Sequence, residues 1–329
     1  MKKLRILLIL LIAFIITGCS FLVLNSNKER DSFNRERVQE TDNENQTVDV
    51  PKEEPVYNKN QDSSEIDIPA DKTKEETQEE APDIESQPQT KANKLDCDVL
   101  DKLDNTKFGW GLRLNNDHTT PGIPSHVNEL IDKYDGIFTG DTSQKVVYLT
   151  FDEGYENGYT SKILDTLKAN DVKSIFFVTG SYVDRNPELV KRMAEEGHEI
   201  GNHTVNHPSL PDIDNAKIEK EILELEEKVY SQYGVQMRYM RPPNGEYSER
   251  TLEAARQLGY KTVFWSFAYK DWDVNDQKGA DYAYNKVMDN LHNGAVILLH
   301  AVSKDNAEAL DRIIKAIREE GYEIMPFNL

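Results

Sequence analysis

Two histidines four residues apart, His203 and His207, are the clearest candidates for metal ligands in the sequence. On a helical turn this spacing places both imidazoles on one face, at the separation that a divalent ion needs. Taken alone, such a pair is more often two surface histidines. With the adjacent acids Asp152 and Glu153 at the end of a neighbouring strand, a metal site is favoured. Two imidazoles and one carboxylate leave coordination positions for water and substrate.

Asp152 and Glu153 follow the apolar run 146–151 and precede a glycine. One carboxylate of such a pair can bind a metal while the other takes a proton from water. A helix N-cap is the alternative, since Asp is favoured there. Capping accounts poorly for two acids in sequence, so the pair indicates hydrolytic chemistry.

Arg241 begins a turn of two prolines, an asparagine and a glycine, and the prolines stiffen its backbone. The guanidinium can pair with Asp152 and hold that acid ionised. A backbone N–H near Asn244 can face a developing oxyanion. An ordinary rigid loop is the alternative interpretation of this segment.

His300 ends the apolar run 295–299, where an imidazole can act as general acid for a leaving amine. Asp271 can orient it. The alternative for His300 is a buried structural histidine, and the alternative for Asp271 is an ordinary loop acid. The aromatic residues near Asp271, Trp272 among them, are individually more typical of core packing, although together they can form a wall on which a sugar stacks. Four histidines lack such a placement and are expected to be surface or structural: His118, His126, His198 and His292.

Apolar, β-branched runs alternate with amphipathic stretches from Lys145 onward, which predicts a mostly parallel sheet with helices outside. The predicted strands are 146–151, 174–178, 198–201, 239–240, 262–267, 295–299 and 322–325. About seven strands in roughly 180 residues favour an α/β fold, a distorted or incomplete (β/α) barrel. An open doubly wound sheet is the second choice. Strand ends gather at one face of such a barrel, and the candidate residues all follow strands.

The N-terminus has the features of a secretory signal. Three basic residues precede the apolar run 6–16, and small residues lead to Cys19. Residues 16–19, Ile-Thr-Gly-Cys, resemble a lipobox, whose cysteine becomes lipidated after cleavage. Apolar residues continue to Leu24, so an uncleaved membrane helix of about 20 residues is the alternative. Either form of this predicted anchor, residues 1–24, tethers the protein outside the cytoplasmic membrane.

Residues 25–94 are predicted to be a disordered acidic linker, because they are highly polar and sustain no apolar period. We interpret the segment as a spacer that gives the following domain its reach; a solvated segment of no specific role is the alternative.

The net charge of −20 argues against nucleic-acid binding through a broad basic surface. Cys97 is expected to be a buried, inert thiol, since two cysteines make no disulfide framework.

These residues together resemble the polysaccharide deacetylases, the NodB-homology domains of carbohydrate esterase family four. Five motifs in order carry the resemblance: Thr-Phe-Asp-Glu-Gly, His-Thr-Val-Asn-His, Arg-Pro-Pro-Asn-Gly, Asp-Trp and Leu-Leu-His. The resemblance covers residues 145–329, the expected catalytic domain. It implies a distorted (β/α) barrel, a zinc-like divalent ion (cobalt or manganese being the alternatives) and water attack on an N-acetyl carbonyl. The implied roles are base for Asp152, metal ligands for His203, His207 and Glu153, tether of the base for Arg241, and acid for His300 with support from Asp271.

A narrower resemblance, carried by residues 108–112, 148–152, 154–160 and 265–269, is to the delta-lactam-biosynthetic de-N-acetylases of spore formers. It makes residues 95–144 a family-specific N-terminal extension. It implies that the substrate is N-acetylmuramic acid in spore-cortex peptidoglycan, after an N-acetylmuramoyl-L-alanine amidase has removed the peptide. The candidate substrate or oxyanion contacts are Asn244, Tyr155, Trp272 and Leu298.

Two positions depart from the family pattern. Glu153 stands where the usual third ligand is Asp, and its carboxylate sits one methylene farther out. Ala268 stands where Asp-x-x-Asp-Trp has its first acid, which removes a supporting group near the acid histidine. Two other hypotheses therefore stay open. One is a deacetylase of N-acetylglucosamine or another acetylated glycan, and the other is a catalytically impaired module that binds wall glycans.

Overall fold

The computed structural model of the protein describes residues 94–115 and 117–329. The described residues all belong to one compact unit, Pro82–Leu329. The predicted anchor with Cys19 lies outside the described residues, as does the predicted linker up to residue 93. Within the described ranges, no helix combines the length and the apolar character needed to cross a membrane.

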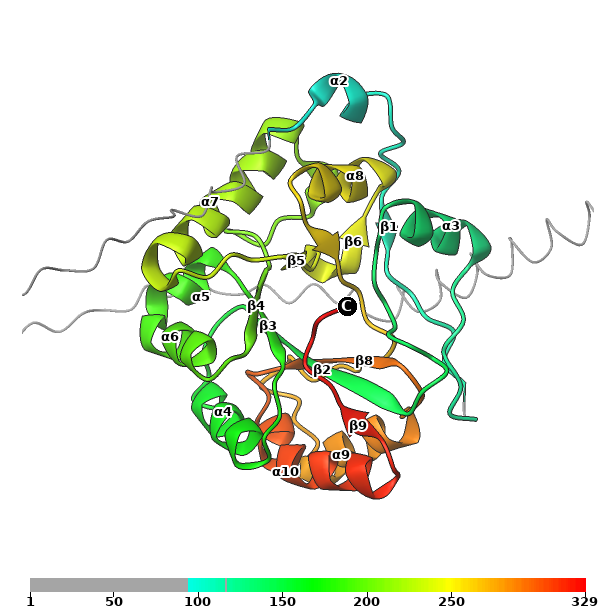
Figure 1. Ribbon diagram of the computed structural model, residues 1–329, viewed down its shortest axis with the longest axis vertical. Coiled ribbons are helices and arrows are strands. Elements are labelled where there is room, and N and C mark those ends of the chain that lie inside the picture. The colour runs from blue at the N-terminus through cyan, green and yellow to red at the C-terminus, as the bar shows by residue number, and fades with distance from the viewer. Residues whose placement is uncertain (1–93, 116) are drawn as a thin grey trace, which may run out of the picture. The chain divides into compact units, whose positions relative to one another are not determined.

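The core of the fold is a curled, incomplete barrel of parallel strands. Its strand order is β7-β5-β4-β3-β2-β8, and β9 pairs with the start of β2. Figure 1 labels these strands except β7. Every pairing in this sheet is parallel, so the predicted α/β architecture is confirmed. The strands are β2 Val146–Glu153, β3 Ile175–Val178, β4 Glu199–Asn202, β5 Tyr239–Met240, β7 Lys261–Thr262, β8 Ala295–His300 and β9 Glu323–Ile324.

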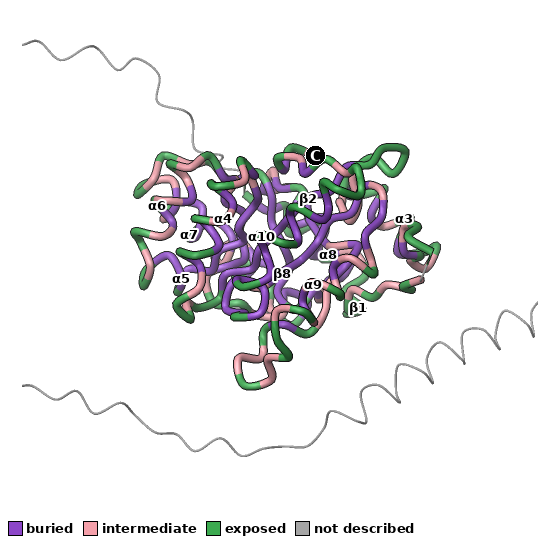
Figure 2. Tube along the Cα trace, turned by 90° about the horizontal axis from the view of Figure 1, so that it is seen from below, coloured by how far each residue is buried: buried purple, intermediate pink, exposed green. Residues whose placement is uncertain are grey.

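Helices lie around the outside of the strands (Figure 1) and turn their apolar sides inward, so that the buried chain is concentrated in the middle of the unit (Figure 2). Several begin at a residue whose side chain accepts a hydrogen bond from the first turn, as at Thr179, Asp214, Ser248 and Ser303. The helices are α2 Cys97–Leu100, α3 Ser125–Lys133, α4 Thr160–Ala169, α5 Gly180–Arg185, α6 Pro187–Glu195, α7 Asn215–Tyr233, α8 Glu249–Gln257, α9 Ala280–Asp289 and α10 Lys304–Glu319, with short 3-10 turns at η1 Leu210–Asp212 and η2 Pro243–Gly245.

Strand β2 is buried on both faces, which explains its continuous apolar run. Tyr148 belongs to the cluster that fills the barrel interior. Leu149 and Phe151 belong to the cluster beneath the helices. Because successive side chains of a strand point to opposite faces, the same alternation places Asp152 on the interior side and Glu153 on the helix side.

The predicted strand 262–267 is mostly wrong, since regular pairing ends at Thr262. Residues 263–267 instead form single bridges, Val263 to Ile137 and Phe267 to Ile297, and so close the gap between β7 and β8 irregularly. The reason lies in the interior. The carbonyls of Val263 and Phe264 accept hydrogen bonds from a buried arginine side chain rather than from a neighbouring strand.

The N-terminal extension packs against the loop that follows β5. Its strand β1, Phe108–Gly109, pairs antiparallel with β6, Glu246–Tyr247. Trp110 then stacks on Phe264, with 4.1 Å between ring centroids, and its indole N–H donates to Trp265 O at 2.9 Å. The extension therefore supports the Arg241–Gly245 turn from outside.

Cys97 is exposed, so the expectation of a buried thiol is wrong. It is the first residue of α2, a single turn that buries only Leu100. At the start of a single exposed turn, Cys97 has no layer of chain above it to bury its thiol. The expectation for the four remaining histidines is confirmed: His118 and His126 are exposed, while His198 and His292 are buried with hydrogen-bonded rings.

Candidate active site

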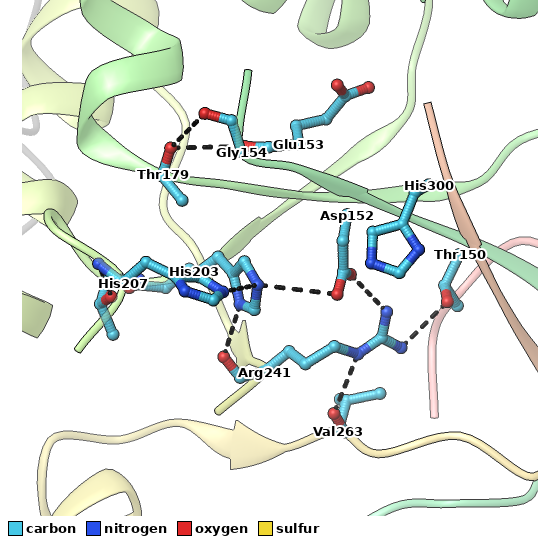
Figure 3. Close-up of polar contacts among 12 residues, drawn as sticks. Thr150, Asp152, Glu153, Gly154, Thr179, His203, His207, Arg241, Val263 and His300 are labelled. Atoms are coloured by element: carbon cyan, nitrogen blue, oxygen red, sulfur yellow. Dashed lines mark hydrogen bonds and ion pairs between the residues drawn. The ribbon is translucent and has the colours of Figure 1, made fainter. Parts of the chain in front are cut away.

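Arg241 follows β5 directly and carries its guanidinium into the barrel interior, where it is fully buried. Nη1 donates to Asp152 Oδ1 at 2.6 Å (Figure 3). Nη2 donates to Thr150 Oγ1 at 2.9 Å, and Nε donates to Val263 O at 3.2 Å. The Phe177 ring centroid lies 4.2 Å from the guanidinium carbon. These contacts fix the cation in one position and satisfy the hydrogen bonding that its burial demands.

Asp152 is almost completely buried beside this cation. Burial by itself raises the pKa of its carboxyl, but the positive charge of Arg241 beside it outweighs burial and leaves the pKa below the ordinary value of 3.8. With Oδ1 taken by the guanidinium, Oδ2 lies 3.6 Å from His203 Nε2. Asp152 is therefore an ionised carboxylate with one oxygen available to accept a proton.

His203 has a defined tautomer. Its Nδ1 lies 2.8 Å from the backbone carbonyl of Arg241, and a carbonyl only accepts, so Nδ1 carries the proton. Burial lowers the pKa of His203 to about 4, so the ring is neutral at neutral pH. Nε2 is then a bare lone pair, and it lies 3.2 Å from His207 Nε2 (Figure 3).

The two imidazoles do not sit on a helical turn, so that prediction is wrong. The segment after β4 is a loop in which Thr204 and His207 both adopt a left-handed backbone, with φ of 66° and 57°. For residues other than glycine such conformations cost about 1–3 kcal/mol each and persist only where the surroundings enforce them. The strained loop, rather than helical periodicity, turns His207 back toward His203.

Neighbouring groups enforce this loop. Thr204 N donates to Asn202 Oδ1 at 2.9 Å, and His207 N donates to Thr204 Oγ1 at 3.0 Å. Gly180 packs so closely on Val205 that an added Cβ would come within 2.8 Å of its side chain. The first residue of α5 therefore has to be glycine for the loop to approach.

The imidazole pair fits a divalent ion. Two nitrogens bound to one tetrahedral zinc at 2.0–2.1 Å would lie roughly 3.3 Å apart, and His203 Nε2 and His207 Nε2 lie 3.2 Å apart. Among residues 94–115 and 117–329, no three His, Cys, Asp or Glu side chains gather into an ion-binding group. The carboxylate nearest to the pair is that of Asp152, and the structure does not bring Glu153 to it.

Glu153 lies on the helix side of β2 and is fully buried (Figure 3). Thr160 Oγ1 donates to its Oε2 at 3.4 Å, while Oε1 has no hydrogen-bond partner among the described residues. Burial and the nearby Glu156 raise its pKa well above the ordinary value of 4.5. Strand alternation thus places the expected third ligand away from the imidazoles, as an acid whose pKa is raised.

His300 ends β8 in direct register with Asp152 on the neighbouring strand β2. Its Nδ1 lies 2.6 Å from Asp271 Oδ1, and its backbone N donates to Asp271 Oδ2 at 2.9 Å. A carboxylate only accepts, so Nδ1 carries a proton and Nε2 is the atom that can exchange one with a substrate. Burial by itself lowers the pKa of His300, but Asp271 outweighs it and leaves the pKa above the ordinary value of 6.5.

The candidate substrate contacts fall into two groups. Tyr155 and Trp272 are 47% and 52% exposed, which is unusual for large aromatic side chains and leaves them available to a ligand. Asn244 is exposed in the turn after Arg241, with a left-handed φ of 57°. Leu298 is buried and pairs in register with Thr150, one layer below Asp152 and His300.

The role of Thr150 in the site went unpredicted. Thr150 lies in the middle of an apolar strand, and it donates to Ile297 O at 2.9 Å while accepting from Arg241 Nη2. A polar residue at an inward position of a buried strand was the available signal, since such a group needs a buried partner.

Comparisons with known proteins agree with this geometry. Residues 139–263 match the family model described as polysaccharide deacetylase. Over 219 residues the chain is 48% identical to the peptidoglycan-N-acetylmuramic acid deacetylase PdaA of Bacillus subtilis. The matched segment covers 66% of this chain and 83% of that protein. The chain belongs to the polysaccharide deacetylase family.

Two further comparisons place this deacetylase more closely. The solved structure of Bacillus subtilis PdaA, a family 4 carbohydrate esterase, matches with a TM-score of 0.66 and 47% identity, covering 68% of this chain and 95% of that one. A peptidoglycan-N-acetylglucosamine deacetylase of Bacillus cereus is 37% identical over 58% of this chain and 70% of its own length. The deacetylase is a hydrolase of acetylated wall glycan.

Replacing Arg241 with Met leaves the buried Asp152 carboxylate without its cation, and we expect the free energy of unfolding to fall by about 3–5 kcal/mol near neutral pH. In the wild type the lowered pKa of Asp152 contributes stability that is present above its unfolded pKa and lost as pH falls. In the variant, burial without the cation raises the pKa of Asp152, so its carboxyl takes up a proton as pH falls and the deficit should shrink toward about pH 4 in urea unfolding. The double variant R241M/D152L, which leaves no buried charge, should recover part of the loss; equal deficits at both pH values would contradict this account.

Replacing Glu153 with Gln tests its placement. Because the folded protein holds Glu153 protonated above pH 4.5, the wild type loses stability as pH rises through the window above that value. The variant has no such loss, so its stability relative to wild type should grow with pH in urea unfolding. Acetate release should stay within about tenfold of wild type, whereas loss of a metal-site residue costs about 10–100-fold or more. If the stability difference between variant and wild type did not change with pH and the variant released no acetate, Glu153 would instead serve the imidazole site.

Proposed function

We propose that this deacetylase removes the acetyl group from N-acetylmuramic acid residues of peptidoglycan, on the route to the muramic delta-lactam of spore cortex. The 48% identity to a peptidoglycan-N-acetylmuramic acid deacetylase supports this substrate. The weaker 37% identity to an N-acetylglucosamine deacetylase makes the other amino sugar the second candidate. One observation supports the hydrolytic function above all others. The Asp152 carboxylate, held by Arg241, lies directly opposite the proton-bearing imidazole of His300 on the neighbouring strand.

Asp152 and His300 supply the two proton transfers that amide hydrolysis needs. Asp152 Oδ2 accepts a proton from water as the water oxygen attacks the acetyl carbonyl carbon. His300 Nε2 then donates a proton to the amide nitrogen, so that the C–N bond breaks and acetate and a free amine leave. Arg241 keeps Asp152 ionised for the first transfer, and Asp271 holds His300 in the tautomer for the second.

His203 and His207 would hold the divalent ion that family members generally use, for which we propose zinc, with cobalt or manganese as alternatives. When bound, such an ion supplies Lewis-acid polarisation of the carbonyl and of water. The neutral ring and bare Nε2 of His203 make it ready to act as a ligand without first losing a proton.

We further propose that the protein acts outside the cytoplasmic membrane. The basic residues, apolar run and Cys19 at the N-terminus support a lipoprotein anchor, with an uncleaved helix as the alternative. The acetylated glycan strand would reach the site after an N-acetylmuramoyl-L-alanine amidase has removed the peptide.

The proposal is tested by incubating the full chain with peptidoglycan whose peptides an amidase has removed, and with chitin-type oligomers, in the presence of zinc or of a chelator. We expect acetate release and the loss of one acetyl group from the muramic sugar by mass spectrometry. Asp152→Asn should lower the rate by about 10²–10⁴-fold in protein that is folded at the assay temperature. Its unfolding midpoint should also fall, because the buried Arg241 guanidinium loses its counter-charge.

Three outcomes discriminate between the alternatives. Loss of acetyl from glucosamine alone would replace the muramic substrate with the second candidate. Glycan binding without acetate release under any metal condition would favour a catalytically impaired binding module. Wild-type turnover by Asp152→Asn would remove Asp152 from the role of base.

The raised pKa of His300 predicts the basic limb of the pH profile. As general acid, His300 must be protonated, so kcat should fall as pH rises through a value above 6.5. Asp271→Asn removes the carboxylate that raises this pKa, so the basic limb should move to lower pH while KM changes little. Lys270→Gln, one residue away and exposed, serves as the control and should leave the limb in place. An unchanged limb in Asp271→Asn would remove His300 from the role of acid.

A further inference from the structure

We propose that Asn306, in the first turn of α10, is a positioning residue that fixes the Asp271 carboxylate for His300, and that Tyr269 stabilises the Asn306 amide in the orientation that this requires. This inference rests on the proposed function, since it concerns how the acid of that reaction is held. Asn306 is fully buried and lies outside every motif singled out in the sequence.

Asn306 completes the hydrogen bonding of Asp271. Its Nδ2 donates to Asp271 Oδ2 at 2.6 Å and to the backbone carbonyl of His300 at 3.2 Å. His300 N donates to the same Oδ2, while Oδ1 receives His300 Nδ1 at 2.6 Å. With donors on both oxygens the carboxylate cannot rotate, and the imidazole is held from both its ring and its backbone.

The direction of the Asn306 amide is determined by its neighbours. Asp271 Oδ2 and the His300 carbonyl only accept, so the amide nitrogen must face them. The Tyr269 hydroxyl donates to Asn306 Oδ1 on the opposite side. A flipped amide would bring an oxygen against the Asp271 carboxylate and the His300 carbonyl, so these two acceptors select the productive orientation. The Tyr269 hydroxyl stabilises that orientation by donating to Oδ1.

The arrangement ties two separate elements together. Tyr269 and Asp271 come from the segment after β7, whereas Asn306 comes from α10, whose N-cap is Ser303. Gln277 reinforces the junction, because its Nε2 donates to Asp271 O at 3.1 Å and its Oε1 accepts from Ser303 Oγ at 2.9 Å. Ala268 offers no polar side chain beside Tyr269, so the side-chain support for Asp271 comes from α10.

The test compares Asn306→Asp and Asn306→Leu in the full chain with a matched control, Asn170→Asp. Asn170 also donates to an aspartate, Asp311 on the same helix α10, at 3.0 Å, but at an exposed place away from the site. The measurements are kcat and KM on peptide-free peptidoglycan at one fixed pH, the urea unfolding midpoint, and the His300 Nδ1–H resonance in protein labelled with 15N-histidine.

We expect kcat to fall by about 10–100-fold in both Asn306 variants, as for other groups that orient a reacting side chain through hydrogen bonds, with KM within about threefold. The His300 Nδ1–H signal should shift or broaden. Tyr269→Phe should show the same signature more weakly, because the amide loses only the donor to its Oδ1. Asn170→Asp should match wild type in both readouts.

An unmoved His300 signal in both Asn306 variants would overturn the proposal, whatever happens to stability. So would a kcat loss that appears equally in Asn170→Asp, since it would then reflect a general change in α10. The His300 Nδ1–H resonance is recorded without any substrate. If the wild type releases no acetate from any glycan, the proposed function fails while the effect of Asn306 on His300 is still measured.

Discussion

The buried guanidinium of Arg241 dictates how the site is laid out. A cation enclosed in a protein interior is tolerated only when it meets an opposite charge and enough acceptors. Asp152 supplies the charge, while Thr150 and the carbonyls of Val263 and Phe264 supply acceptors. Those two carbonyls are withdrawn from strand pairing, so the barrel closes only irregularly between β7 and β8. One oxygen of Asp152 is thereby fixed, and the other is directed toward the imidazoles.

Two adjacent acids illustrate how surroundings decide chemistry. Asp152 faces a guanidinium and has a lowered pKa, whereas Glu153 faces apolar helices and another acid and has a raised one. A single peptide bond separates them, and the alternation of the strand sends them to different environments. The loop after β4 also assigns a side chain to one environment. Its left-handed residues, Thr204 and His207, bring the His207 ring back to the interior side, where Asp152 lies.

The acid side of the site is built differently from the base side. The base is tethered by one buried side chain from a strand end, while His300 depends on a carboxylate that is itself held by the segment after β7 and by the start of α10. Hydrogen bonds from two elements over-determine the position of Asp271. Such redundancy suits a group that must keep one tautomer of a half-buried imidazole through repeated proton transfer.

Local patterns were enough to predict the parallel α/β sheet, most of its strands and the gathering of Asp152, Arg241, His203, His207 and His300, because hydrophobic period and strand-end position are properties of short segments. They failed where long-range contacts decide. Residues 263–267 follow an irregular course because two of their carbonyls accept hydrogen bonds from Arg241. The non-helical turn at 203–207 is enforced by Asn202 and Gly180. The side on which Glu153 lies depends on the exact register of β2, and the support from Asn306 joins residues 35 apart in sequence. Residue types and their order carry the chemistry, but only packing between distant segments assigns each group its partner and its charge.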